Sequence, residues 1–166
     1  MKTIPALLAL SAFYSIAIVL SPLESKAFTY ELETIEKKIE SIGVKVIWIR
    51  DNVKISNILN CSNRLYGAYI PDLNVVYICQ GAHQKDYLEL LGTLKHEGWH
   101  AAQMNCNRGK PVLAKEKILA SLKKSQIKVL HQYAPSKIEL EAEARVIEQV
   151  PFRSWLRGFD HYCNIR

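Results

Sequence analysis

A short motif with two histidines and a glutamate constrains this chain more than any other segment. His96, Glu97 and His100 form the pattern H-E-x-x-H, and the residues before it place leucines at helical spacing. Histidines four residues apart lie on one face of a helix, so both imidazoles can reach a single metal ion. We therefore expect a half-buried helix over residues 86–104 that carries a metal site.

The motif has two interpretations. A solvated surface helix can carry these letters by coincidence, without any bound ion. If the histidines do bind Zn²⁺, the ion lowers the pKa of its bound water to roughly 7. Glu97 then projects where it can accept the proton of that water as a general base. The second interpretation predicts a zinc-dependent hydrolase, with a peptide bond as the expected target.

A catalytic zinc ion usually has three protein ligands, so a third must come from elsewhere in the chain. Cys106 stands where a longer zinc pattern has its last histidine, but a disulfide is the expected state of an exported cysteine. Glu139 and Glu143 lie four residues apart in a later predicted helix, whereas Glu141 is expected to point elsewhere. One of the pair could bind the metal and the other could accept a hydrogen bond from a ligand histidine. Alternatively, Glu139 forms a capping box with Ser136.

The two segments together resemble the gluzincin class of zinc metallopeptidases. In that class H-E-x-x-H is followed tens of residues later by E-x-x-A-[D/N/E], a pattern that Glu139, Ala142 and Glu143 match. The predicted order of helix, strand, hairpin, motif helix and glutamate helix is also similar to the compact minigluzincins. This resemblance covers roughly residues 65–151.

The resemblance implies an α+β, zincin-like fold in which a small sheet with a hairpin packs on the motif helix. It implies that His96, His100 and Glu139 bind Zn²⁺ and that Glu97 activates water. It also implies that a hairpin strand lines the cleft and pairs with an extended peptide. The chain departs from the class at Gly98–Trp99, between the glutamate and the second histidine. The alternative function is a secreted binding module on an inactive zincin scaffold.

The N-terminus has the pattern of a secretory signal peptide. Lys2 precedes an almost wholly apolar stretch at residues 4–20, and Ser25-Lys26-Ala27 places small residues at a cleavage site. We expect cleavage after Ala27 and a single mature domain over residues 28–166, exported to a periplasm, a lumen or the medium. The alternative is an uncleaved anchor. Cleavage would leave no stable membrane insertion.

An even number of cysteines follows the predicted signal peptide, which favours two disulfides in an oxidising compartment. Three connectivities are possible, and we predict Cys61–Cys79 and Cys106–Cys163. The remaining apolar patterns predict further elements. Helices are expected at 31–40, 112–133 and 137–149, and strands at 44–49, 65–70 and 75–79, with an irregular segment or short helix within 50–62. The C-terminal tail is expected to pack back on the body.

The chain is basic, with a formal net charge of +6. Its densest basic stretch, residues 110–128, could attract an anionic partner, but interleaved apolar residues favour a solvated amphipathic helix. No nucleic-acid motif accompanies the charge, so the expected partner is a peptide or protein substrate. The spacing does not choose a donor to a reaction oxyanion among Tyr133, His131, His161 and Tyr162.

Overall fold

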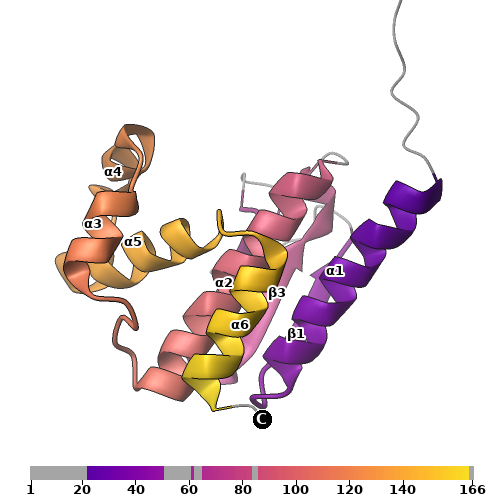
Figure 1. Ribbon diagram of the computed structural model, residues 1–166, viewed down its shortest axis with the longest axis horizontal. Coiled ribbons are helices and arrows are strands. Elements are labelled where there is room, and N and C mark those ends of the chain that lie inside the picture. Colours follow the sequence, from indigo (N-terminus) through magenta and orange to yellow (C-terminus); the bar gives the residue numbers. More distant parts are fainter. Residues whose placement is uncertain (1–21, 51–60, 62–64, 84–85, 165–166) are drawn as a thin grey trace, which may run out of the picture.

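The computed structural model describes residues 22–50, 61, 65–83 and 86–164 (Figure 1). Within these residues the fold is α+β, with six α-helices and one three-stranded sheet. The elements in chain order are α1 (Pro22–Glu40), β1 (Lys45–Ile49), β2 (Gly67–Ile70), η1 (Pro71–Leu73), β3 (Val75–Cys79), η2 (Gln80–His83), α2 (Tyr87–Asn107), α3 (Lys115–Ser121), α4 (Lys124–Leu130), η3 (Pro135–Lys137), α5 (Ile138–Ile147) and α6 (Phe152–Cys163). The prediction for the segment within 50–62 lies almost wholly outside the described residues.

The sheet is mixed and has the strand order β1-β3-β2. β1 pairs with β3 in parallel, and β2 pairs with β3 antiparallel, as the predicted hairpin requires. The short 3₁₀ turn η1 ends at Asn74, whose left-handed φ of 51° reverses the chain. Val46, Val76 and Ile78 belong to the main core, which lies between the sheet and the helices. This pairing leaves β2 at an edge of the described sheet.

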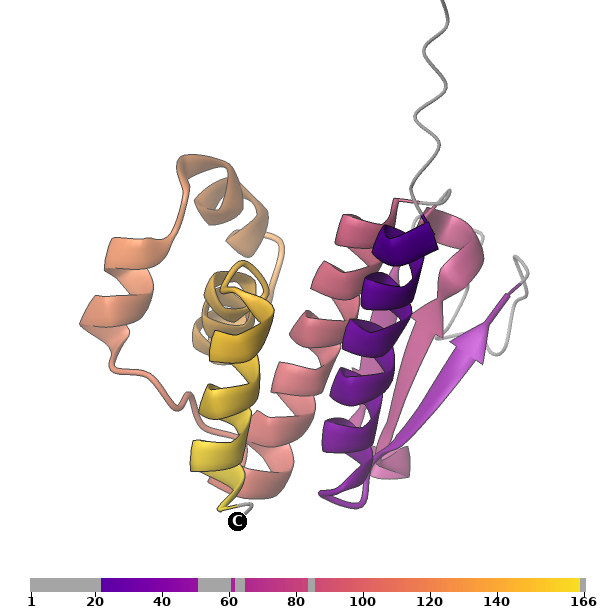
Figure 2. The same ribbon diagram turned by 45° about the vertical axis from the view of Figure 1, so that its right-hand side comes forward.

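α2 is the central helix of the molecule. Asp86 caps it by accepting a hydrogen bond from the Glu89 amide, as the sequence predicts. α1 runs alongside α2 over one face of the sheet, and α6 lies on another side of α2 (Figure 2). Gly98 permits the α1 contact, because a Cβ there would lie 2.6 Å from Ile39 Cδ1. Trp99 is buried in the core, so the unusual Gly98–Trp99 pair serves packing.

The prediction of one helix over residues 112–133 is wrong. The structure has two short helices, α3 and α4, on the side of α2 away from the sheet (Figures 1 and 2). Leu122 and Lys123 between them are both extended, with ψ of 134° and 151°. The Gln126 side chain accepts from the Lys123 amide and donates to the Arg145 carbonyl of α5. The first bond belongs to the local capping box of α4 and the second is tertiary, and both favour a new helix start over continuation of α3.

The C-terminal tail packs back as expected, but it does so as a regular helix, α6, that buries Trp155 and Phe159. Both predicted disulfides are confirmed, and Cys106–Cys163 ties the end of α2 to the end of α6. No helix among the described residues combines the length and apolarity needed to cross a bilayer. α1 begins at Pro22 and contains the bond after Ala27, where cleavage stays a prediction.

Candidate metal centre

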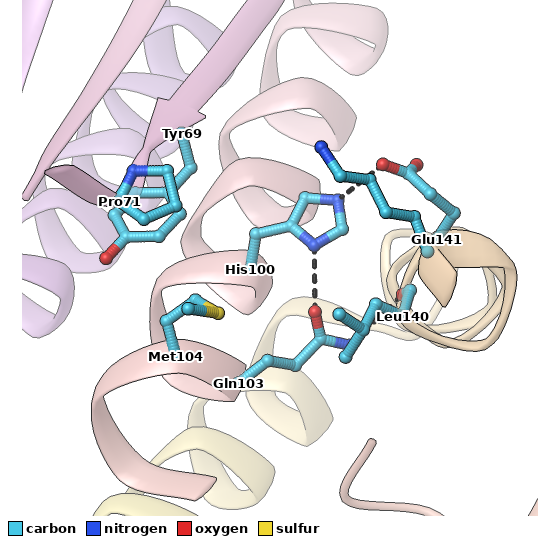
Figure 3. Close-up of a pocket in the computed structure, with 8 residues that line it drawn as sticks. Tyr69, Pro71, His100, Gln103, Met104, Leu140 and Glu141 are labelled. Carbon is cyan, nitrogen blue, oxygen red and sulfur yellow. Dashed lines mark hydrogen bonds and ion pairs between the residues drawn. The ribbon is translucent and has the colours of Figure 1, made fainter. Parts of the chain in front are cut away.

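Three side chains from two helices meet at one point beside the sheet. His96 and His100 project from the same face of α2, and Glu141 projects from α5. The two Nε2 atoms lie 3.2 Å apart, and Glu141 carboxylate oxygens lie 3.5 Å from His96 Nε2 and 3.4 Å from His100 Nε2. Figure 3 shows the Glu141 carboxylate and the imidazole of His100 turned toward one another. These residues form the group of possible ligands that we call the His-His-Glu group.

The spacing of the His-His-Glu group fits a tetrahedral metal ion. Zn–N and Zn–O bonds of about 2.0–2.2 Å place neighbouring tetrahedral ligand atoms about 3.3–3.5 Å apart. The Nε2–Nε2 separation of 3.2 Å lies at that value, whereas the 3.5 Å and 3.4 Å distances run to two different oxygens of Glu141. One ligand atom from each of the three residues lies within 4.8 Å of the other two. Two imidazole nitrogens and one carboxylate are also a common donor set for catalytic zinc. The described residues therefore offer a site that can hold a metal ion.

The predicted ligand Glu139 is not part of this group, and this prediction needs correction. The Glu139 side chain is exposed and forms a 2.8 Å ion pair with Lys115 of α3. Its predicted capping role is also absent from the structure, since no side chain caps α5 and the 3₁₀ turn η3 leads directly into the helix. Glu141, which the helical spacing placed on another face, is the carboxylate that reaches both histidines.

The second nitrogen of His100 identifies its tautomer. His100 Nδ1 lies 2.8 Å from Gln103 Oε1 (Figure 3). The Gln103 amide nitrogen donates to the Leu140 carbonyl and to Glu143, which fixes Oε1 as the acceptor. His100 Nδ1 must therefore carry the proton, and its Nε2 presents a lone pair to the His-His-Glu group. This orientation is the one that a metal-binding histidine needs.

The buried carboxylate of Glu143 holds the Gln103 side chain that contacts His100. Glu143 is fully buried and accepts hydrogen bonds from the Gln103 side chain and from the backbone amides of Val112 and Leu113. The prediction placed Glu143 in direct contact with a ligand histidine. In the structure Glu143 contacts Gln103, and Gln103 contacts His100. Glu143 therefore positions Gln103 and the chain leading into α3.

His96 is held by a different partner. Its Nδ1 lies 2.8 Å from the partly buried carboxylate of Glu148, the C-cap residue of α5, three residues after Arg145. Burial lowers the pKa of His96, but hydrogen bonds to Glu141 and Glu148 outweigh this effect and raise the pKa to about 10. Burial likewise acts to raise the pKa of Glu141, whereas its hydrogen bonds with His100 and His96 hold that pKa below its usual range. Without a metal ion, the surrounding carboxylates thus stabilise the protonated, cationic form of His96.

Glu97 is positioned by the edge strand. Its Oε2 accepts a 2.9 Å hydrogen bond from the Tyr69 backbone amide of β2. Gly67 makes the close approach of β2 to α2 possible, because a Cβ at that position would lie 2.7 Å from Thr93 Cγ2 and 3.1 Å from Glu97 Cγ. One oxygen of Glu97 is therefore fixed while the carboxylate stays beside the two histidines.

Two pockets flank the His-His-Glu group. A pocket of about 150 Å³ is lined by Tyr69, Pro71, His100, Gln103, Met104, Lys137, Leu140 and Glu141 (Figure 3). A second pocket, of about 340 Å³, is lined by Leu65, Tyr66, Gly67, Thr93, His96, Glu97, Val129, Gln132, Tyr133, Arg145 and Glu148. We call them the His100 pocket and the His96 pocket. His100 and Glu141 line the first of these pockets, and His96 lines the second.

The structure separates the four candidate oxyanion donors. Tyr133 lines the His96 pocket together with His96 and Glu97. Tyr162 packs against Trp99 in the core, and His131 and His161 are exposed and line neither pocket. Burial raises the pKa of Tyr133, and the charge of Glu141 raises it further, so its hydroxyl stays protonated. Tyr133 is the candidate that lies near the possible ligands.

Comparison of the chain with protein-family models, with curated proteins and with solved structures found no match.

Proposed function

We propose that this chain is an exported zinc metallopeptidase with a zincin-like fold, in which His96, His100 and Glu141 bind the ion. One observation carries the proposal: the ligand atoms of two histidines and a glutamate lie within 4.8 Å of one another, close to a second glutamate that is held in place by a β-strand amide. Export is supported by the two disulfides, since these bonds persist in oxidising compartments.

Glu97 is the proposed general base. A carboxylate beside the ligand group can take a proton from the attacking water and later pass it to the leaving amine. The amide of Tyr69 fixes one oxygen of Glu97 and leaves the other for this proton. When bound, Zn²⁺ would supply Lewis acidity to the substrate carbonyl and would lower the pKa of a coordinated water.

Tyr133 is the proposed donor to the oxyanion that develops on the substrate carbonyl. Arg145 Nη2 donates to the Tyr133 hydroxyl oxygen at 3.2 Å, so the hydroxyl can donate its own proton, either to the nearby Glu141 carboxylate or to a substrate oxygen. A donor of this kind contributes about 10²–10³ in kcat where it has been removed from other hydrolases.

The substrate is proposed to be an extended peptide that lies along β2. This strand and the turn after it contribute Gly67 to the His96 pocket and Tyr69 and Pro71 to the His100 pocket. A peptide running beside an edge strand would therefore pass both pockets and place alternate side chains in them. The bond between the two pockets would lie over the ligand group.

Zinc binding is the first test, and α5 offers its own matched control. The purified protein should contain about one zinc per chain, because three protein ligands suffice for stable binding. Glu141→Ala should lose most of this zinc. Glu139→Ala should keep it, because Glu139 pairs with Lys115 at the surface. Metal analysis of the three proteins checks this expectation, and equal zinc loss in both variants would contradict the assignment of Glu141.

Hydrolysis is the second test. Glu97→Gln keeps an oxygen that can accept from the Tyr69 amide, so the variant should retain zinc and lose cleavage of an unfolded protein substrate by at least about 10²-fold. Retained cleavage would refute the role of Glu97. A wild-type protein that binds zinc but cleaves no peptide would favour the secreted binding module instead.

A further inference from the structure

We propose that the His96 pocket is a carboxylate-binding subsite in which Arg145 recognises an acid group of the peptide next to the bond that is cleaved. This subsite rests on the proposed function, because its ligand is a substrate only if the protein is a peptidase. The carboxylate has two possible sources, an acidic side chain or the free C-terminus of the peptide. Both present the same planar anion to a guanidinium group.

Arg145 has unused hydrogen-bonding capacity. Its Nη2 donates to the Tyr133 hydroxyl, and its Nε is buried without a hydrogen-bond partner among the described residues. None of the ion pairs found in the described part of the chain includes this guanidinium. A buried donor without a partner is unfavourable, and Nε is closed off from solvent in this structure, so an acceptor from outside the chain must meet the guanidinium through its Nη groups.

The position of Arg145 directs it toward the reaction centre. Glu141 and Arg145 of α5 and the C-cap residue Glu148 recur at helical spacing on the side of α5 that meets α2. Glu141 reaches both histidines and Glu148 reaches His96, so the residue between them lies beside the same group. Arg145 lines the His96 pocket together with His96, Glu97 and Tyr133. A bound acid group would therefore lie within one residue of the cleaved bond.

The local charges favour a single negative charge as the ligand. Glu97, Glu141 and Glu148 contribute −3 around the site, and a divalent ion with Arg145 would contribute +3. A monoanionic carboxylate adds little repulsion to this balance, whereas a phosphate dianion adds twice as much. Arginine binds a planar carboxylate through two parallel N–H donors, and each Nη of Arg145 carries two N–H groups, of which only one is engaged by Tyr133.

The test measures binding, so it does not depend on turnover. The zinc-loaded Glu97→Gln protein is titrated calorimetrically with three otherwise identical short peptides. One ends in glutamine amide, one in glutamate amide and one in glutamine with a free carboxylate. At least one acidic peptide should bind about tenfold or more tightly than the neutral one. The acidic peptide that gains this advantage identifies the source of the carboxylate.

Variants then assign the preference to one residue. Adding Arg145→Gln should bring the affinity ratio of acidic to neutral peptide close to one. Arg145→Lys, which keeps the charge, should reduce the ratio and serves if the glutamine variant does not fold. Lys137→Gln is the matched control, because Lys137 is the cation of the opposite pocket. It should leave the ratio unchanged.

The outcomes separate this inference from the proposed function. Equal binding of all three peptides, a ratio that survives Arg145→Gln, or a ratio lost in Lys137→Gln would overturn the carboxylate subsite. Cleavage by the wild-type protein without any acidic preference would also overturn it, although the peptidase function would stand. Arg145-dependent binding of an acidic peptide by a wild-type protein that cleaves nothing would support the subsite and refute the peptidase.

Discussion

His96 and His100 present the same nitrogen to the same point, but their other nitrogens are held in different ways. His100 is held by the neutral amide of Gln103, which is buried and joined to the buried carboxylate of Glu143. His96 is held by the carboxylate of Glu148, whose side chain is 26% exposed. One histidine therefore belongs to an interior network, and the other faces an accessible charge.

The difference indicates that the partners of His100 mainly fix its geometry, whereas the partner of His96 mainly changes its protonation. A buried network fixes geometry, because each of its members has no alternative partner in water. A half-exposed carboxylate contributes charge to its histidine at little structural cost, since water can replace it. We therefore expect changes behind His100 to affect folding most, and changes behind His96 to affect protonation most.

The largest expected effect is on stability. Glu143→Ala removes one of the two acceptors of the Gln103 amide and the acceptor of two backbone amides, and it removes buried volume, so the free energy of unfolding should fall by about 3–5 kcal/mol. Glu148→Ala should change it by no more than about 1 kcal/mol. Urea unfolding of the two metal-free variants checks the comparison. Equal losses would show that the two sides do not differ.

Zinc affinity should fall by an intermediate amount when the partner of either histidine is changed. Gln103→Leu removes the acceptor of the His100 Nδ1 proton, so zinc should bind about 10–100-fold more weakly. Glu148→Gln keeps an oxygen that can accept from His96 Nδ1, so its loss should be near the lower end of this range. Competition with a chromophoric chelator gives both dissociation constants. A greater loss in Glu148→Gln would reverse the proposed order.

The smallest effect is on the pH dependence of the metal-free protein. The folded pKa of His96, about 10, lies above its ordinary value of 6.5, so the native state binds the extra proton. This stabilisation is fully present below about pH 6.5 and is lost as the pH rises toward about 10. Glu148→Gln should make the fall shallower, because Glu148 helps to raise this pKa.

Thermal unfolding in the presence of a chelator, at a series of pH values, measures this fall. Gln103→Leu is the control, since Gln103 carries no charge and should leave the slope nearly unchanged. A slope that is identical in the wild type and in Glu148→Gln would contradict the role assigned to Glu148.

Local patterns predicted much of this structure. The motif helix and its Asp86 cap, the hairpin and the three strands follow from periodicity and turn residues near one another in the chain. The disulfide pairing was one of three possibilities, and the predicted one is confirmed. The division into α3 and α4 was missed because Lys123 is not a usual N-cap residue, and because the bond from Gln126 to α5 is tertiary.

Local patterns also did not identify the candidate third ligand. E-x-x-A occurs twice in residues 139–144, beginning at Glu139 and again at Glu141. The spacing fixes which residues share a face of α5, but it does not fix which face meets α2. A polar stripe was present in the sequence at Glu141, Arg145 and Glu148, and it would have pointed to the correct face.

The sequence by itself determined that His96, Glu97 and His100 lie together on one helix, because a helix places residues four apart on one side whatever surrounds it. Only the tertiary structure decided that Glu141 joins them and that Glu139 pairs with Lys115 instead. The rotation of α5 against α2 is set by packing and by the buried bonds of Glu143 and Gln103. Such contacts join residues far apart in the chain, so no single segment encodes them.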